Sequence, residues 1–235
     1  MTKDEVLKEL EKFGNPGTKK VLLKHGAQEP FFGVKVADLK KILKKTKKNH
    51  KLSLELYKTG NTDAMYLAGL MADENKITKK QLQDWAKKAY WYYLSEYTVP
   101  WVAAETPYAM ELGLEWIESK KENISAAGWA TLASFASLTD DTNIDLKLYK
   151  KLLKRAGKEV HKAPNRVRYV MNGFIIAVGA YITSLTDEAL AIGEKVGKVS
   201  VDMGGTACKV PLVPVAIGKV QARNAIGKKR KTARC

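Results

Sequence analysis

Apolar residues recur along most of this chain at the three- and four-residue spacing that is typical of amphipathic helices. The clearest run follows Pro164, where the apolar positions from Val167 to Ile182 keep the i, i+3, i+4, i+7 pattern. The alternation of apolar and polar residues that is typical of strands is not sustained in any segment. The pattern therefore predicts an all-α protein.

The predicted helices are short and are joined by short links. They cover residues 4–13, 18–25, 36–51, 52–58, 63–73, 79–93, 95–105, 108–119, 123–138, 144–157, 165–182 and 186–196. Thr78 and Ser95 are predicted N-caps, because a hydroxyl there can accept a hydrogen bond from an amide of the first turn. Helix pairs repeat roughly every 35 to 45 residues, which favours an α-solenoid of HEAT-like helical repeats with an irregular C-terminal arm. An irregular helical bundle would give much the same pattern.

The character of the chain changes near residue 200. We predict a HEAT-like repeat domain over residues 1–200 and a basic arm and tail over 201–235, because the last segment is rich in Gly and Pro and has no acid after Asp202. Its glycine-rich stretch lacks the phosphate-loop pattern, so Gly204-Gly205 is a predicted turn. The chain ends in a predicted mobile tail whose run Lys228–Lys231 suits a polyanion or serves only solubility.

Charge adds a class of partner to this picture. The chain has 41 Lys and Arg against 25 Asp and Glu, a net charge of +16, which is more than solubility requires and favours a polyanion. No apolar run approaches the roughly 18 residues of a spanning helix, and no signal-peptide pattern follows Met1, so we expect a cytoplasmic protein that does not bind membranes. The two cysteines form no CxxC pair and the three histidines are scattered, so we expect no metal and no cofactor.

The candidate chemistry lies between Trp85 and Trp101. Seven of these residues are aromatic, and Glu96 is the single acid among them. The rings either bind a flat or cationic ligand or pack in the interface between two helices. Tyr92 and Glu96 are four residues apart and share a face if the helix continues; if Ser95 is an N-cap, Glu96 lies in the first turn of the next helix.

Two segments, AYWYYLSEYTVPWVAAE and APNRVRYVMNGFIIAVGAY, together with the repeats and the charge, resemble the DNA alkylation repair family of AlkD-like HEAT-repeat DNA glycosylases. The resemblance extends from about Phe32 to Ile182. It implies a solenoid that wraps duplex DNA in its concave face and excises cationic N3- or N7-alkylated purines. A carboxylate and aromatic faces would stabilise the cation that develops as the glycosidic bond breaks.

The resemblance also assigns roles to individual residues. Trp91, Tyr92, Glu96 and Pro100 match the spacing of the family's active-site motif, with Tyr in place of its second tryptophan and Glu in place of its aspartate. Glu96 would be the electrostatic stabiliser or the group that positions water, and Trp91 and Tyr92 would form the aromatic wall. The family's groove arginine aligns at or near Ala126, and its later tryptophan falls near Gly173. Both side chains are therefore absent.

We therefore expect a monomeric DNA-binding protein, nucleoid-associated in the cytoplasm, that acts on double-stranded DNA with damage or unusual structure. DNA glycosylase activity is one outcome, and non-catalytic binding of branched or structured nucleic acid is the alternative. A protein-interaction scaffold is disfavoured, because its groove would be mixed in charge. The candidate nucleic-acid contacts are basic residues on a predicted helix, at the start of the long helix and in the tail: Lys44, Lys48, Lys162, Arg166, Arg168, Lys228, Lys229, Arg230 and Lys231.

Overall fold

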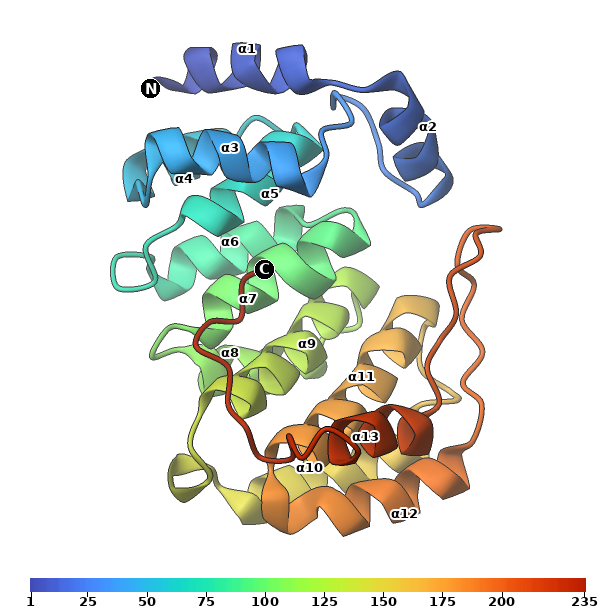
Figure 1. The fold of residues 1–235 in the computed structure, drawn as a ribbon. Helices are drawn as coiled ribbons and strands as arrows, with labels where there is room; N and C mark the ends of the chain where they lie inside the picture. Colours follow the sequence, from blue (N-terminus) through green and yellow to red (C-terminus); the bar gives the residue numbers. More distant parts are fainter.

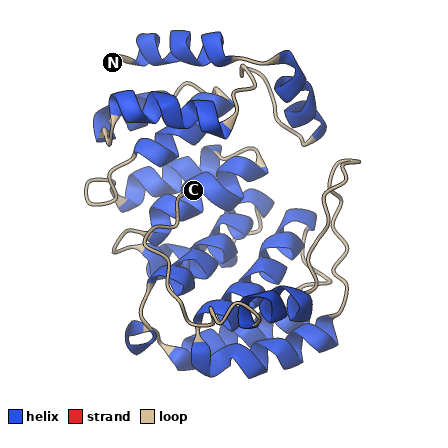
Figure 2. Cartoon of the chain, viewed as in Figure 1, coloured by secondary structure: helices blue, strands red, loops and turns tan.

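The structure is a computed structural model that describes residues 1–235, and it contains thirteen α-helices and no strand (Figures 1 and 2). The predicted all-α class is therefore confirmed. The helices are α1 (Lys3–Phe13), α2 (Pro16–Lys24), α3 (Val36–Thr46), α4 (His50–Tyr57), α5 (Thr62–Met71), α6 (Lys79–Lys88), α7 (Val99–Ala104), α8 (Ala109–Ile117), α9 (Glu122–Leu138), α10 (Leu146–Glu159), α11 (Asn165–Tyr181), α12 (Thr186–Val196) and α13 (Val213–Gln221). A π-helix, η1 (Tyr93–Thr98), precedes α7, and two 3-10 turns, η2 (Asp141–Asn143) and η3 (Thr183–Leu185), flank the last long helices.

The helices stack in chain order from α1 at one end to α12 at the other (Figure 1). Packing between helices is most extensive where α9 contacts α11 and α8. Two large apolar clusters follow one another, one from Val6 to Ala127 and the other from Ile117 to Ile217. No single helix is long and apolar enough to cross a membrane, although the bent pair formed by α11 and the segment 183–196 meets that test by length and composition.

The two predicted N-caps have different outcomes. Thr78 is confirmed, because its hydroxyl accepts from the Gln81 amide at 3.2 Å while the Gln81 side chain accepts from the Thr78 amide at 2.9 Å. Ser95 is not a cap: it is buried inside η1, where the backbone makes i to i+5 bonds such as Val99 N–H to Leu94 C=O. A wider helical turn can continue through a capping-type residue, so no helix begins at Ser95.

Helix α13 attaches the C-terminal arm to the solenoid. Val213 and Ile217 are fully buried in the second apolar cluster, against α11 and α12. Gly179 and Gly193 permit this approach, since a Cβ at either position would lie 2.4 Å from an α13 side chain. The arm after residue 200 therefore contributes to the core, whereas the predicted domain boundary stays a prediction.

The predicted mobile tail is wrong, because the tail after α13 is packed along the solenoid towards α7 (Figure 1). Lys229 Nζ donates to the carbonyl oxygens of Ala136 and Tyr181, at 3.0 and 2.6 Å, and to Asp141 at 2.8 Å. The Ala233 side chain is fully buried. A basic sequence thus finds acidic and carbonyl partners that lie far away in the chain.

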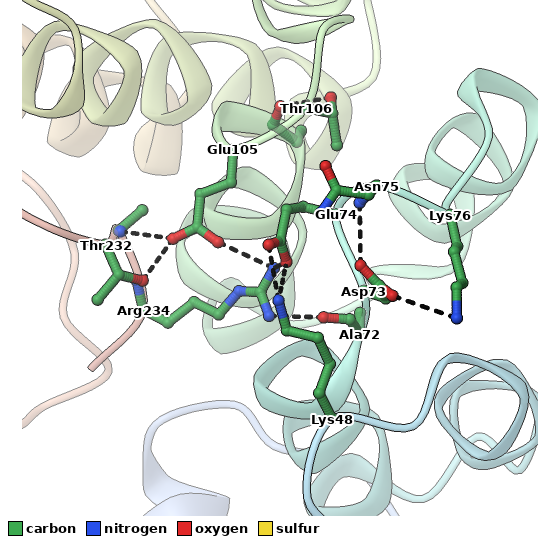
Figure 3. Close-up of polar contacts among 12 residues, drawn as sticks. Lys48, Ala72, Asp73, Glu74, Asn75, Lys76, Glu105, Thr106, Thr232 and Arg234 are labelled. Carbon is green, nitrogen blue, oxygen red and sulfur yellow. Dashed lines mark hydrogen bonds and ion pairs between the residues drawn. The ribbon is translucent and has the colours of Figure 1, made fainter.

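Arg234 provides the last anchor of the tail (Figure 3). Its guanidinium lies between Glu74 and Glu105, at 3.0 and 2.9 Å, and also donates to the Ala72 carbonyl at 2.6 Å. Glu105 accepts in addition from the Ala233 amide at 2.8 Å. The end of the chain therefore ties the loop after α5 to the end of α7.

Candidate functional site

The aromatic stretch from Trp85 to Trp101 forms the end of α6, a short link, η1 and the start of α7. Some of its rings pack in the core between helices, and others reach the surface, where a ligand could contact them. Trp85 stacks on Tyr57 in the core, with ring centroids 4.1 Å apart, and is 4% exposed. Tyr92, Tyr93, Tyr97 and Trp101 are half-buried and reach the surface.

Trp91 belongs to the buried group. It is 4% exposed, stacks on Tyr93 with centroids 4.3 Å apart, and packs against Ala27 and Phe31. Its indole N–H donates to the His25 carbonyl at 2.7 Å. Trp91 therefore fastens the segment after α2 to η1 and has no free ring face for a ligand.

Glu96 lies at the centre of the site, where Arg166 of α11 binds its carboxylate. The guanidinium donates two hydrogen bonds, from Nε to Oε1 at 2.6 Å and from a terminal nitrogen to Oε2 at 2.7 Å. The Glu96 side chain is 1% exposed and that of Arg166 is 17% exposed. Such a two-point pair fixes both side chains and uses both carboxylate oxygens.

Two tyrosine rings flank the guanidinium. Its central carbon lies 4.3 Å from the Tyr92 ring centroid and 4.7 Å from that of Tyr169, within cation-π distance of each. Tyr92 and Glu96 thus meet the same partner, so the shared face predicted for a continuing helix is the correct alternative. Burial raises the pKa of Glu96 to about 7, while the bonds to Arg166 lower it.

The loop between α12 and α13, residues 197–212, projects from the C-terminal end of the solenoid beside α11 (Figure 1) and contacts Arg166 of this ion pair. Asn165 and Asp202 exchange two hydrogen bonds, at 2.7 and 3.0 Å, and Arg166 donates to the Met203 sulfur at 3.4 Å. Gly204 and Gly205 both have positive φ, which confirms the predicted turn. The turn lies close to the Lys24 carbonyl at the end of α2, so this loop reaches from α12 to the N-terminal part of the solenoid.

The first turn of α11 satisfies much of its hydrogen bonding within the protein. The Arg166 amide donates to Glu122 at 2.7 Å, and Arg168 donates to the carbonyl oxygens of Ala163 and Ser200, at 2.7 and 3.3 Å. Lys162 has an exposed side chain and forms no ion pair. Of these predicted phosphate contacts, Arg166 is already neutralised, and a role for Lys162 or Arg168 stays a prediction.

The other predicted basic contacts do not share one location. Lys44 is exposed on α3 without an ion pair, and Lys228 is exposed in the tail. Lys48, Arg230 and Lys231 line one cavity of about 680 Å³ beside the tail, where Lys48 pairs with Glu74 at 2.6 Å. Lys229 points inward to the carbonyl oxygens described above.

Three residues of the site were missed by the sequence analysis. Tyr169 and Met203 complete the surroundings of Arg166, and Glu122 caps α11, but each joins through contacts between distant segments. Tyr169 could have been suspected from its position one helical turn after Arg166. The two positions that lack the family's side chains also differ, since Ala126 is fully buried whereas Gly173 is exposed.

The helix stack and this site together define a HEAT-like repeat solenoid with an ion pair buried at its centre. Residues 6–197 match the family described as DNA alkylation repair enzyme, and the chain belongs to that family. The resemblance found in the sequence is thereby confirmed.

Relatives cover nearly the whole chain. An uncharacterized protein of Listeria innocua is 34% identical over 217 residues, which are 90% of this chain and 93% of that protein. One of Listeria monocytogenes is 35% identical with the same coverage. A solved structure, described as a new family of proteins related to the HEAT-like repeat DNA glycosylases with affinity for branched DNA structures, is 34% identical, with a TM-score of 0.92 and full coverage of both chains. This likeness confirms the predicted HEAT-like solenoid.

Proposed function

We propose that this protein binds double-stranded DNA that is branched or otherwise structured, and that it does so without excising bases. The observation that carries the proposal is the Glu96–Arg166 pair. Both oxygens of the one acid in the aromatic stretch accept from a guanidinium, and the side chain is 1% exposed. Because a guanidinium already offsets the charge of this carboxylate, it would stabilise a developing sugar cation less than a free carboxylate would.

The net charge of the chain and its family membership support DNA as the partner. The net charge is +16, and each phosphate that a Lys or Arg neutralises releases condensed counterions. The chain belongs to the DNA alkylation repair enzyme family, and the similar solved structure is described as having affinity for branched DNA structures. We further propose that the protein acts as a monomer, which light scattering of the free and DNA-bound protein tests. We propose the cytoplasm as the place where it meets DNA.

The first experiment compares affinity for a four-way DNA junction with affinity for a fully paired duplex of equal length, at one salt concentration. We expect tighter binding to the junction. Lys162→Ala should reduce the slope of log affinity against log salt by roughly 0.9, if Lys162 neutralises one phosphate. Lys8→Ala on α1 makes the same charge change at an exposed lysine without an ion pair and should leave the slope unchanged. Equal affinity for junction and duplex would contradict the proposal.

Excision of alkylated purines is the second candidate, favoured by the family and by the retained spacing of Trp91, Glu96 and Pro100. The decisive measurement is release of 7-methylguanine or 3-methyladenine from methylated duplex DNA, with Glu96→Gln as the comparison. Our proposal expects no release above that of the variant. Release by the wild-type protein alone would establish a glycosylase that uses Glu96.

A further inference from the structure

A small pocket adjoins Glu96 of the ion pair, where η1, α7, α9 and α11 meet. Its volume is about 250 Å³. Tyr97, Trp101 and Tyr169 form aromatic walls, and all three are half-buried. The Tyr97 and Trp101 ring centroids lie 5.5 Å apart with planes at 58°. The pocket is therefore lined by an angled pair of aromatic rings and by a third ring from α11.

The pocket exists because small residues line two of its helices. Gly173 on α11 has nothing within 4 Å of the position where a Cβ would lie. Ala130, Ala133 and Ser134 supply the wall from α9. Any larger side chain at Gly173 or Ala133 would occupy the space that the three rings leave open.

The chemistry of the walls points to a flat ligand without a net charge. Glu96 reaches the pocket, but both of its oxygens accept from Arg166, so it offers no unpaired charge. Aromatic faces bind other rings by stacking, and every nucleobase has such a face. A volume of about 250 Å³ lies just below the roughly 300–1,000 Å³ of sites for drug-sized ligands, which suits one ring system.

We propose that this pocket holds one unpaired nucleobase of a bound DNA, stacked against Tyr97, Trp101 or Tyr169. The inference rests on the proposed function, and it adds a reason for selectivity. A bulge, or a junction with an unpaired nucleotide, presents an unstacked base at little cost, whereas a perfect duplex or a fully paired junction must first break a base pair. The pocket would thus distinguish DNA structures without reading their sequence.

The test uses the full-length protein and two four-way junctions, one fully paired and one with a single unpaired 2-aminopurine at the branch point. Stacking on an aromatic side chain quenches 2-aminopurine fluorescence. We expect the wild-type protein to quench the probe and to bind that junction about fivefold or more tightly than the paired one.

Two variants fill the pocket from different helices, Gly173→Leu on α11 and Ala133→Leu on α9. Each should abolish quenching and reduce affinity for the probe junction to that for the paired junction. Gly218→Leu on α13 is the matched control, since its Cβ position also has nothing within 4 Å and it lies outside the pocket. It should leave quenching and affinity unchanged. Circular dichroism of each variant verifies the fold.

The outcomes separate the two proposals. If the wild-type protein binds both junctions equally and does not quench the probe, the pocket is not a base site, although the DNA-binding function stands. Quenching that survives both filling variants also overturns the inference. If the protein binds neither junction nor duplex, the proposed function fails, and the inference fails with it.

Discussion

Arg166 and Glu96 are 70 residues apart in the sequence, yet the guanidinium donates to both carboxylate oxygens, at 2.6 and 2.7 Å. The pair joins α11 to η1 across the middle of the solenoid. It also gives the buried acid of the aromatic stretch a partner from another helix. The consequences for stability can be measured.

Arg166→Ala should destabilise the protein by about 3–5 kcal/mol, because it leaves Glu96 buried without its counter-ion. Urea unfolding at a pH well above 7 measures the change. Arg168→Ala is the control, since it removes an arginine of the same turn whose bonds go only to neutral carbonyl oxygens. The double variant Arg166→Ala, Glu96→Gln should recover part of the loss. Equal losses for the two single variants would contradict the role given to the pair.

The pH dependence of stability should contain a contribution from Glu96. Burial raises its pKa from the ordinary 4.5 to about 7, so between these values the folded chain binds more protons at Glu96 than the unfolded chain does. The contribution of Glu96 to the free energy of unfolding therefore falls as pH rises from 4.5 to 7, and is constant above. The measurement is the unfolding free energy of the wild type minus that of Glu96→Gln across this window, which should fall as pH rises. If it instead rises with pH, the bonds to Arg166 lower the pKa of Glu96 more than burial raises it.

Arg234→Ala should release the tail and cost about 1–3 kcal/mol, because it leaves Glu74 and Glu105 without the cation between them. Trypsin reports the release directly, since the run Lys228–Lys231 offers it several cleavage sites. Cleavage there should be slow in the wild-type protein and faster in the variant. Arg223→Ala, at an exposed arginine that forms no ion pair, should leave the rate unchanged. Fast cleavage of the wild-type tail would mean that the tail is free in solution.

Thr78→Ala should cost about 1 kcal/mol, because it removes the hydroxyl that accepts from the Gln81 amide at the start of α6. Thermal unfolding measures this loss. Lys80→Ala, an exposed position in the same turn, should have almost no effect. Similar losses in both variants would assign the effect to helix propensity and not to the cap.

Much of the fold could be predicted from local signals. The apolar spacing between Val167 and Ile182 predicts α11, and the Thr78 hydroxyl predicts the start of α6, because these features depend on residues within a few positions of one another. The start predicted at Ser95 was wrong, since a π-helix differs from a cap only in hydrogen bonds that tertiary packing selects. The mobile tail was wrong because the partners of Arg234, at Glu74 and Glu105, are more than a hundred residues away.

The sequence by itself determined the helical class, the basic character, the family resemblance and the presence of one acid within an aromatic stretch. Only the tertiary structure decided which groups surround that acid. Periodicity and charge are properties of neighbouring residues, whereas the state of Glu96 depends on its burial and on a guanidinium that α11 brings to it. Likewise, the sequence shows only that Gly173 has no side chain. The packing of α9, α11 and η1 shows that the space beside Gly173 is an open pocket.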